Sequence, residues 1–488
     1  LALITTLKDG VLKHRLILDC RVSGSNSMTT KWERVVLPRI WDIIRDSLEM
    51  KKGDVTYKLS YMVCDFKDAF YKVPIHEAER QYYAVIHKGK VLVWKRIGQG
   101  SLNGPTLWGR LSALVGRFTQ SLLQDGEARV HIYTDDPIVI IRASKNRTKR
   151  IMAMIMLCWL ILGFDLSFHK GQAGSKVSWV GYSIEDVGHA ITVEIKADFI
   201  KEFKELTKKV MRPNVISIRD LRTFTGKANH IANLLLGWRP FLDALWAAVS
   251  KNKANMTRKK SRAPRGMVWT KQIRSSTTWI ASFLAGQHGP LYRRWQADYF
   301  DYNGEWVAFV LDASPWGFGG VLVEDGEPTT YFEDAISDDD VRIHEAKRAT
   351  AEAQQKWECM CYLIALTIWK DKWQHKRVAV AVKSDNMSAL ALAARLKIAS
   401  SSNLIGREVA LLYSHATFEP RLIEHIPGIA NVLADDLSRI HEPHANKGIP
   451  EALKHLAATR VPPRDESFYK TLAAKQVGSS GKGGRYGQ

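Results

Sequence analysis

The sequence predicts an α+β protein of several domains, and three observations lead to that fold class. The chain has 488 residues, enough for roughly three domains of ordinary size. Apolar, strand-like stretches that end in acidic residues occur in two separate regions, within residues 61–141 and within residues 306–435. Residues 186–303, between these regions, carry helical patterns rich in Lys and Arg, including 198–211 and 217–236. We therefore expect two α+β units joined by a basic helical segment.

The charge balance indicates a polyanionic partner. The chain holds 71 Lys and Arg against 50 Asp and Glu, a formal net charge of +21. Such an excess favours nucleic acid, because phosphates that bind Lys and Arg release counterions. A basic ribosomal or chromatin protein would share the charge, but not the 16 Trp and the long apolar strands.

The cysteines and the apolar runs favour an intracellular protein. The five cysteines lack paired CxxC spacing, which argues against a disulfide framework and against a zinc site. The longest apolar run, residues 151–164, is too short to span a bilayer, and no signal peptide opens the chain. We expect a cytoplasmic or nuclear protein that is not secreted and not bound to a membrane. Because the first residue is Leu1, we also expect a segment cut from a longer polyprotein, or a chain whose start is lost.

Residues 130–141 (VHIYTDDPIVII) predict a β-hairpin with acid at its tip. Asp135 and Asp136 alone would be most simply explained by turn propensity. Upstream, however, residues 61–71 (YMVCDFKDAFY) form another apolar strand that carries an isolated acid, Asp65. Three carboxylates on two strands are suited to a pair of Mg²⁺ ions about 4 Å apart, which activate a hydroxyl and stabilise a leaving phosphate. The pattern therefore favours nucleotidyl transfer.

CDFKDAFY followed by YTDD resembles motifs A and C of reverse transcriptases, and further pieces of that family pattern follow in order. The resemblance implies a right-hand polymerase with partial fingers in residues 1–53, a palm in 54–185, and a thumb, connection and basic linker in 186–303. It also implies that Asp65 and Asp135 bind two Mg²⁺ ions, with Mn²⁺ as an alternative, while Asp136 supports the site.

The same resemblance assigns nucleotide contacts in the fingers and at the end of the first palm strand. Lys8 and Arg15 flank the turn of a basic hairpin, LKDGVLKHR, where two cations can reach one triphosphate; alone, this is a solvated hairpin. Residues 31–50 after it predict a helix. Phe70 stands where the family places an aromatic ring that blocks a ribose 2'-hydroxyl, although a ring at a strand end also fills core.

Three further nucleotide contacts come from motifs B and D of the family. Gln99 and Gly100 lie in KRIGQGSLNGPTLW, whose glycines allow close backbone approach and whose end, after Pro105, predicts a helix. Lys170 ends GFDLSFHK, which resembles motif D, where a lysine helps to protonate the leaving pyrophosphate. Most exposed lysines are nevertheless only solvated charges.

Residues 179–182 (WVGY) resemble the primer-grip hairpin, so Trp179, Gly181 and Tyr182 are assigned to primer binding. Pro137 departs from the family pattern, since most relatives have a residue there that donates a backbone hydrogen bond. We expect a less regular hairpin at this position, with the carboxylates unchanged.

Four further acids follow in the order strand, helix, strand, helix. They are Asp312 before a Gly-rich turn, Glu358 at the start of a helical run, Asp385 after a strand, and Asp435 in HIPGIANVLADDLSR. Each alone is more often a cap or turn residue. Together they form a candidate two-metal site for phosphodiester hydrolysis.

The order of these acids and the string GIANVLADDLSR resemble the RNase H domains of retroelements, in the form found in LTR retrotransposons and DIRS-like elements. The resemblance implies an α/β RNase H-like domain in residues 304–442 with two metal ions. It makes Asp435 rather than Asp436 the fourth ligand, and His425 a mobile histidine that aids product release; a strand-end histidine held by packing fits equally well. Glu352 is the alternative to Glu358, because the spacing from the first acid is longer than usual.

Residues 443–488 are expected to be a disordered tail, because the periodicity fades and the end, QVGSSGKGGRYGQ, is rich in Gly and Ser.

Together, the resemblances cover residues 8–440 and imply the reverse transcriptase and RNase H of a retrotransposon Pol polyprotein. Such an enzyme copies RNA into DNA and degrades the RNA of the hybrid. The implied partners are an RNA template, a DNA primer, the RNA/DNA hybrid, deoxynucleoside triphosphates and other Pol segments, and the implied setting includes a retroelement particle.

Two alternatives stay open. One is a catalytically silent, host-retained scaffold that binds RNA; the loss of a carboxylate would signal it, and all seven are present. The other is an RNA-dependent RNA polymerase, against which Phe70 and the appended nuclease argue.

Overall fold

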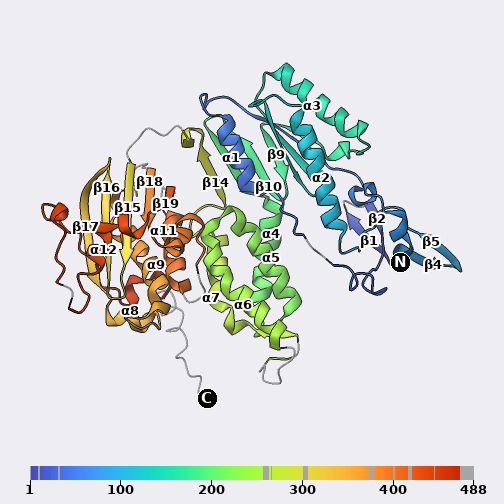
Figure 1. Cartoon of the computed structure of the whole chain (residues 1–488). Helices are drawn as coiled ribbons and strands as arrows, with labels where there is room; N and C mark the ends of the chain where they lie inside the picture. The colour runs from blue at the N-terminus through green and yellow to red at the C-terminus, as the bar shows by residue number, and fades with distance from the viewer. Residues whose placement is uncertain are drawn as a thin grey trace, which may run out of the picture. The chain divides into compact units, whose positions relative to one another are not determined.

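The structure is a computed structural model, and Figure 1 follows its elements along the chain. It describes residues 2–8, 11–30, 33–255, 263–264, 266–300, 306–372, 379–398, 402–415, 420–444 and 446–472. The chain forms two compact units, one of Leu1–Lys196 with Tyr292–Asp301 and the other of Ala197–Leu291 with Tyr302–Gln488. Both units contain helices and strands, so the α+β class that the sequence predicts is confirmed. The finer domain boundaries stay predictions.

An antiparallel sheet of four strands forms the centre of the first unit. Its order is β6 (Ala128–Tyr133), β7 (Asp136–Ile141), β3 (Ser60–Val63) and β8 (Gln172–Gly174). Strand β7 is interior to the sheet, and its apolar residues 138–141 are fully buried. Helices α2 (Gly104–Ser121) and α3 (Lys145–Ile161) supply Trp108 and Trp159 to the same core, where both rings meet Phe66. The strand ends that carry the acids are therefore anchored in a rigid core.

A second antiparallel sheet of the first unit has the order β14 (Tyr292–Gln296), β11 (Ala190–Ile195), β10 (Tyr182–Asp186) and β9 (Lys176–Trp179). Strand β14 pairs with β11 although the helices of the second unit lie between them in sequence. Helix α1 (Ile40–Met50) contacts β11. The predicted helix over residues 31–50 is wrong over the described residues 33–39, because Pro38 disfavours helical geometry at the residue before it and Arg39 is extended.

Two small hairpins complete the first unit. They are β1 (Ala2–Lys8) with β2 (Val11–Ile17), and β4 (Ala84–His87) with β5 (Lys90–Val93). The basic hairpin that the sequence predicts is thus present, while its tip, residues 9–10, lies outside the described residues.

Four helices open the second unit, as the Lys- and Arg-rich periodicity predicts. They are α4 (Ala197–Met211), α5 (Ile218–Leu234), α6 (Arg239–Asn255) and α7 (Arg274–Leu284), joined by the short pair β12 (Val215–Ser217) and β13 (Met267–Trp269). Phe203 and Phe224 stack in their core with ring centroids 5.1 Å apart. The basic linker expected at 251–265 lies largely outside the described residues. Among the helices that the structure describes, none is both long enough and apolar enough to cross a membrane.

A mixed sheet of five strands forms the rest of the second unit. The order is β17 (Glu327–Ala335), β16 (Gly317–Glu324), β15 (Trp306–Ala313), β18 (Ala379–Ser384) and β19 (Pro420–His425); the first three are antiparallel, and β18 and β19 run parallel to β15. The accompanying helices are α8 (Asp338–Ile343), α9 (Ala351–Ile368), α10 (Met387–Arg395), α11 (Asn403–His415) and α12 (Val432–Ser438). Helix α9 begins at Ala351, ahead of the predicted start at Glu358.

The segment after Glu442 is ordered over residues 446–472, where the sequence predicts disorder. Leu453 and Tyr469 are fully buried, and the Tyr469 hydroxyl lies 2.9 Å from His344 Nε2. Arg464 is buried against Asp340, with Nη2 and Oδ2 2.7 Å apart. A few large side chains anchor this segment without a long helix or strand, so periodicity does not reveal it. Residues 473–488 lie outside the described residues.

We predict a large difference between two Lys→Met substitutions in the first unit. Lys51 and Asp186 form an ion pair (Nζ–Oδ2 2.9 Å) with both side chains fully buried. Lys51→Met leaves the Asp186 carboxylate buried without its cation and should lower the free energy of unfolding by about 3–5 kcal/mol. Lys176→Met breaks the exposed pair with Glu185 (2.8 Å) and should cost less than about 1 kcal/mol. Urea denaturation of both variants checks this, and equal losses would contradict it.

Two candidate acidic active sites

The hairpin predicted at residues 130–141 forms and presents its acids at the turn. Tyr133 pairs with Asp136, which leaves a two-residue turn of Thr134 and Asp135, with Thr134 in the left-handed region (φ 55°). Two buried indoles fix the turn: Trp108 Nε1 donates to the Thr134 carbonyl (2.7 Å), and Trp179 Nε1 donates to the Asp136 carbonyl (2.9 Å). The acids therefore sit on a turn with restricted freedom.

Asp65 reaches the hairpin because the chain around it is paired on both sides. On one side, the Phe66 amide donates to the Asp135 carbonyl (2.9 Å). On the other, the Ser167 amide donates to the Asp65 carbonyl (2.9 Å), and the Lys67 amide donates to the Asp165 carbonyl (2.8 Å). The backbone at Asp65 is thus held between the acidic hairpin and residues 165–167.

Pro137 does not interrupt the hairpin, contrary to the expectation of a less regular structure. It pairs in register with Ile132, and its carbonyl accepts a hydrogen bond from the Cys64 amide (3.2 Å). Proline lacks only the donor, so the acceptor still links β7 to the chain before Asp65.

Burial and mutual repulsion raise the pKa of both hairpin acids. Desolvation is the larger cause for Asp135 and for Asp136; repulsion from Asp65 adds to both, and Asp136, which also faces Asp135, reaches a pKa of about 6. Lys170 Nζ lies 2.6 Å from Asp65 Oδ1, and Arg15 is close enough to lower the pKa of Asp135. The donor set is three carboxylates, and the pKa of two of them, Asp135 and Asp136, is raised, which fits hard divalent cations.

The other predicted nucleotide contacts have distinct surroundings. A Cβ atom on Gly100 (φ 115°) would lie 2.0 Å from the Leu18 carbonyl, so this position requires glycine. The Gln99 carbonyl accepts from the Leu18 amide (2.9 Å), which ties this segment to β2. Phe70 is partly buried and packs on the core of the first unit, so it fills core and is also partly exposed. The side chain of Lys8 lies outside the described residues.

The predicted primer-grip hairpin exposes a turn rather than its aromatic rings. Val180 and Gly181 form the turn between β9 and β10, both with positive φ (44° and 84°). Trp179 and Tyr182 are 2% and 4% exposed. The backbone of the turn is therefore the part that can meet a ligand, while Trp179 positions Asp136.

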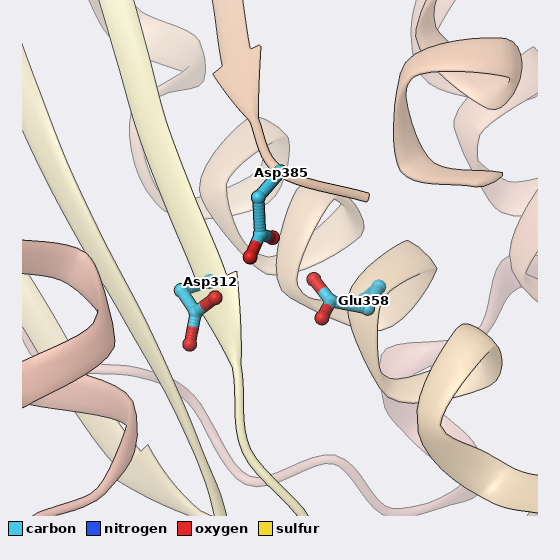
Figure 2. A group of neighbouring side chains, drawn as sticks. All are labelled: Asp312, Glu358 and Asp385. Atoms are coloured by element: carbon cyan, nitrogen blue, oxygen red, sulfur yellow. The ribbon is translucent and has the colours of Figure 1, made fainter. Parts of the chain in front are cut away.

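The second acidic constellation brings three of its four predicted carboxylates together (Figure 2). Asp312 lies on β15, Glu358 on α9, and Asp385 directly after β18. One oxygen from each lies within 4.8 Å of the others. In Figure 2 the three side chains point toward one another. Since β15 and β18 are parallel, their ends bring Asp312 and Asp385 to the same edge of the sheet.

These acids carry a strong electrostatic penalty. Burial raises the pKa of Glu358 well above its usual value, with repulsion from Asp312 as the next cause. Burial also raises the pKa of Asp312 to about 6, although a hydrogen bond from Ser438 opposes the shift. Glu358 Oε2 is buried without a hydrogen-bond partner. An unpaired oxygen facing two further carboxylates fits a hard divalent ion.

Asp435 lies near this group but is held by cations. Arg439 Nε is 2.7 Å from Asp435 Oδ1. The negative charge of Asp435 contributes to the raised pKa of Asp312. Asp436 pairs instead with Lys447 (2.8 Å). Glu352, the alternative to Glu358, is exposed. His425 Nε2 lies 3.0 Å from the Asp385 carbonyl, so this histidine sits beside the acids.

Glycines in β16 bring α12 close to Asp312, which the sequence interpretation missed. The predicted Gly-rich turn is wrong, because residues 317–320 lie within β16. A Cβ on Gly319 would be 2.4 Å from the Ala434 carbonyl, so the helix can pack this closely only against glycine. Ser438 Oγ thereby donates to Asp312 Oδ2 (2.6 Å). The signal was the string GFGG, whose close backbone contact only the fold reveals.

Comparison with known proteins gives a family match within the first unit and partial matches to retroviral polyproteins. Residues 11–184 match the family model described as reverse transcriptase (RNA-dependent DNA polymerase). The Gag-Pro-Pol polyprotein of squirrel monkey retrovirus is 28% identical over 164 residues, and the Gag-Pol polyprotein of walleye dermal sarcoma virus is 27% identical over 176 residues. These matches cover 32% and 34% of this chain and 9% of each polyprotein, so the chain spans a small part of their length.

Solved structures of a foamy viral protease-reverse transcriptase are also similar. One, in complex with double-stranded DNA, has a TM-score of 0.45 at 19% identity and covers 87% of this chain and 65% of that one. Another, in complex with an RNA/DNA hybrid, has a TM-score of 0.42 at 17% identity and covers 92% of this chain and 52% of that one.

We predict that Glu358→Gln stabilises the protein in EDTA, increasingly so as pH rises. Folding raises the pKa of Glu358, so the unfolded state binds fewer protons than the folded state above the usual pKa, and stability falls as pH rises through that window. Glutamine does not ionise, so the variant does not lose this stability as pH rises. The melting temperature should exceed that of the unaltered protein by a few degrees at pH 8 and by less at pH 5.

The exposed Glu352→Gln on the same helix is the matched control and should leave the melting temperature unchanged at both pH values. A Glu358→Gln effect of the same size at pH 5 and pH 8 would contradict the account.

Proposed function

We propose, from the reverse transcriptase region in residues 11–184, that this chain is an RNA-directed DNA polymerase that also hydrolyses RNA in an RNA/DNA hybrid. One observation carries the proposal: Asp312, Glu358 and Asp385 converge at the edge of the five-stranded sheet, and at a separate place the acidic hairpin of the matched region holds Asp135 and Asp136 close enough to Asp65 to raise their pKa. Each set fits a pair of divalent ions, which is the arrangement that phosphoryl-transfer enzymes use.

In the polymerase site, Asp65 and Asp135 would hold two Mg²⁺ ions, with Mn²⁺ as an alternative, and Asp136 would support them. The ions supply Lewis acidity for attack of the primer 3'-hydroxyl on the α-phosphate and departure of pyrophosphate. Arg15, whose charge acts on Asp135, and Lys8 would neutralise the triphosphate. Gln99, Gly100 and the turn at Gly181 would position nucleotide, template and primer, so the protein contributes mainly orientation and charge.

In the nuclease site, Asp312, Glu358, Asp385 and Asp435 would hold the two ions that activate water against the RNA strand. Ser438 orients the Asp312 carboxylate, and Gln354 donates to Glu358 Oε1 (3.1 Å), so the donor oxygens are held before substrate arrives. His425 would assist product release beside Asp385. The RNA 2'-hydroxyl gives this site a group by which to distinguish RNA from DNA.

The proposed partners are an RNA template, a DNA primer, their hybrid and deoxynucleoside triphosphates, within a Pol polyprotein of a retroelement. The net charge of +21 supports a nucleic-acid partner. The five cysteines are all free thiols, which is compatible with the proposed intracellular setting.

A second candidate function is a scaffold that binds RNA without chemistry. Two observations argue against it. All seven acids of the two sets are present. In the nuclease set, three carboxylates lie close together at an electrostatic cost that a scaffold does not require. An RNA-dependent RNA polymerase is disfavoured by the ring of Phe70.

We predict that one reaction separates the two sites. A labelled DNA primer on an RNA template, with Mg²⁺ and deoxynucleotides, should be extended while the template is cleaved. Asp135→Asn should lower extension on the order of 10²-fold or more and spare cleavage, and Asp385→Asn should do the reverse. If folded, unaltered protein binds the hybrid but neither extends nor cuts, the scaffold candidate is correct.

We predict that Phe70→Ala relaxes the choice of sugar. The preference for deoxynucleotides over ribonucleotides, measured as a ratio of kcat/KM in primer extension, should fall on the order of tenfold or more, because the ring no longer opposes a 2'-hydroxyl. Tyr71→Phe, beside it, should keep the ratio. A preference for ribonucleotides in the unaltered protein would instead support the RNA polymerase.

A further inference from the structure

Two chain segments pair beside Asp65, and each contributes a lysine that forms an ion pair with an aspartate of the other segment. Phe66 forms an isolated antiparallel bridge with Leu166, so residues 65–67 and 165–167 lie side by side. From one segment, Lys72 reaches Asp165 with Nζ and Oδ2 2.7 Å apart; from the other, Lys170 reaches Asp65 with Nζ and Oδ1 2.6 Å apart. The two ion pairs are alike in length and origin. They differ in that Asp65 belongs to the acidic site and Asp165 does not.

The Lys170 pair occupies an atom that a metal would need. Asp65 Oδ1 is a candidate ligand, and the Lys170 ammonium sits on it at hydrogen-bond distance. Asp65 is 16% exposed, whereas the Lys170 side chain is 41% exposed. Lysine is a compact charge on a flexible stem, so its end can move to solvent while Asp65 stays in place.

The backbone around Lys170 is fixed, so that only the side chain has to move. Lys170 ends the one-turn helix Phe168–Lys170, where its amide donates to the Ser167 carbonyl (2.9 Å) and the Gly171 amide donates to the Phe168 carbonyl (3.0 Å). A change of side-chain rotamer can therefore exchange the ion pair without a change in the fold.

We propose that Lys170 is a resident cation that neutralises Asp65 before metal arrives, and that metal binding displaces it. This inference rests on the proposed polymerase site and adds a coupling to it. The displaced ammonium swings away from the carboxylate and becomes available to the phosphates of the nucleotide. Lysine and metal compete for one oxygen, and by linkage the loss of either strengthens the hold of the other.

The test is equilibrium binding of Mn²⁺, followed by the electron paramagnetic resonance of free Mn²⁺ in low salt without nucleotide. All proteins carry Asp385→Asn, which weakens the nuclease site so that the palm site is measured. We expect Lys170→Ala to lower the Kd about threefold or more, because the competing cation is gone. Lys170→Arg, which keeps a cation on Asp65, should bind Mn²⁺ like the parent.

Lys72→Ala is the matched control, since it removes an equal charge from the neighbouring pair and should change the Kd less than about twofold. Asp65→Asn should abolish the tight site, and melting in EDTA verifies that each variant is folded. An unchanged or weaker Kd for Lys170→Ala, or an equal gain for Lys72→Ala, would overturn the inference.

The outcome is separable from that of the proposed function. Primer extension without a shift in Kd for Lys170→Ala would leave the polymerase standing and remove the exchange. A shift in Kd without any primer extension would support the exchange of lysine for metal and remove the polymerase.

Discussion

Crowding of carboxylates that have lost much of their water is the constraint on which both sites depend. Each site gathers acids at the ends of buried strands, and desolvation together with mutual repulsion raises the pKa of Asp136 and of Asp312 to about 6. The folded chain bears this cost because large cores hold the strand ends in place. A divalent cation relieves it directly, since it replaces repulsion between oxygens with attraction to a shared charge.

The two sites hold their acids by different means. In the first unit, Trp108 and Trp179 donate indole hydrogen bonds to the carbonyls of the acidic turn, so two large aromatic side chains set the position of Asp135 and Asp136. In the second unit, Gly319 lets α12 approach β16 so closely that Ser438 reaches Asp312. The first solution fixes the backbone of the turn and the second fixes a carboxylate side chain, and both leave charge as the variable that a ligand changes.

Features that are local in sequence could be predicted, and features that depend on distant pairing could not. The acidic hairpin follows from strand propensity around a tight turn, the α+β class is confirmed, and residues 11–184 match the reverse transcriptase family model. By contrast, the backbone at Asp65 is held by a hydrogen bond from the distant Ser167 amide. Strand β14 likewise joins a sheet whose other strands precede four helices in the sequence. No short window of sequence contains both partners of such contacts.

The C-terminal segment shows the same limit for packing. Composition and weak periodicity predict disorder, but Arg464 anchors the segment through several buried hydrogen bonds to Asp340, and Tyr469 through its contact with His344. The hydrogen bond from Ser438 to Asp312 is likewise invisible until α12 lies on the sheet. Roles of the individual site residues, which were read from motifs, stay predictions until they are measured.

The central claim is that two separate acid sets are each built to hold divalent ions. The most direct test is a crystal of the protein soaked in Mn²⁺ and examined by anomalous scattering. The account predicts anomalous peaks at two places, one between Asp65 and Asp135 and one among Asp312, Glu358 and Asp385. A well-ordered crystal with Mn²⁺ elsewhere, and no peak at either acid set, would contradict it.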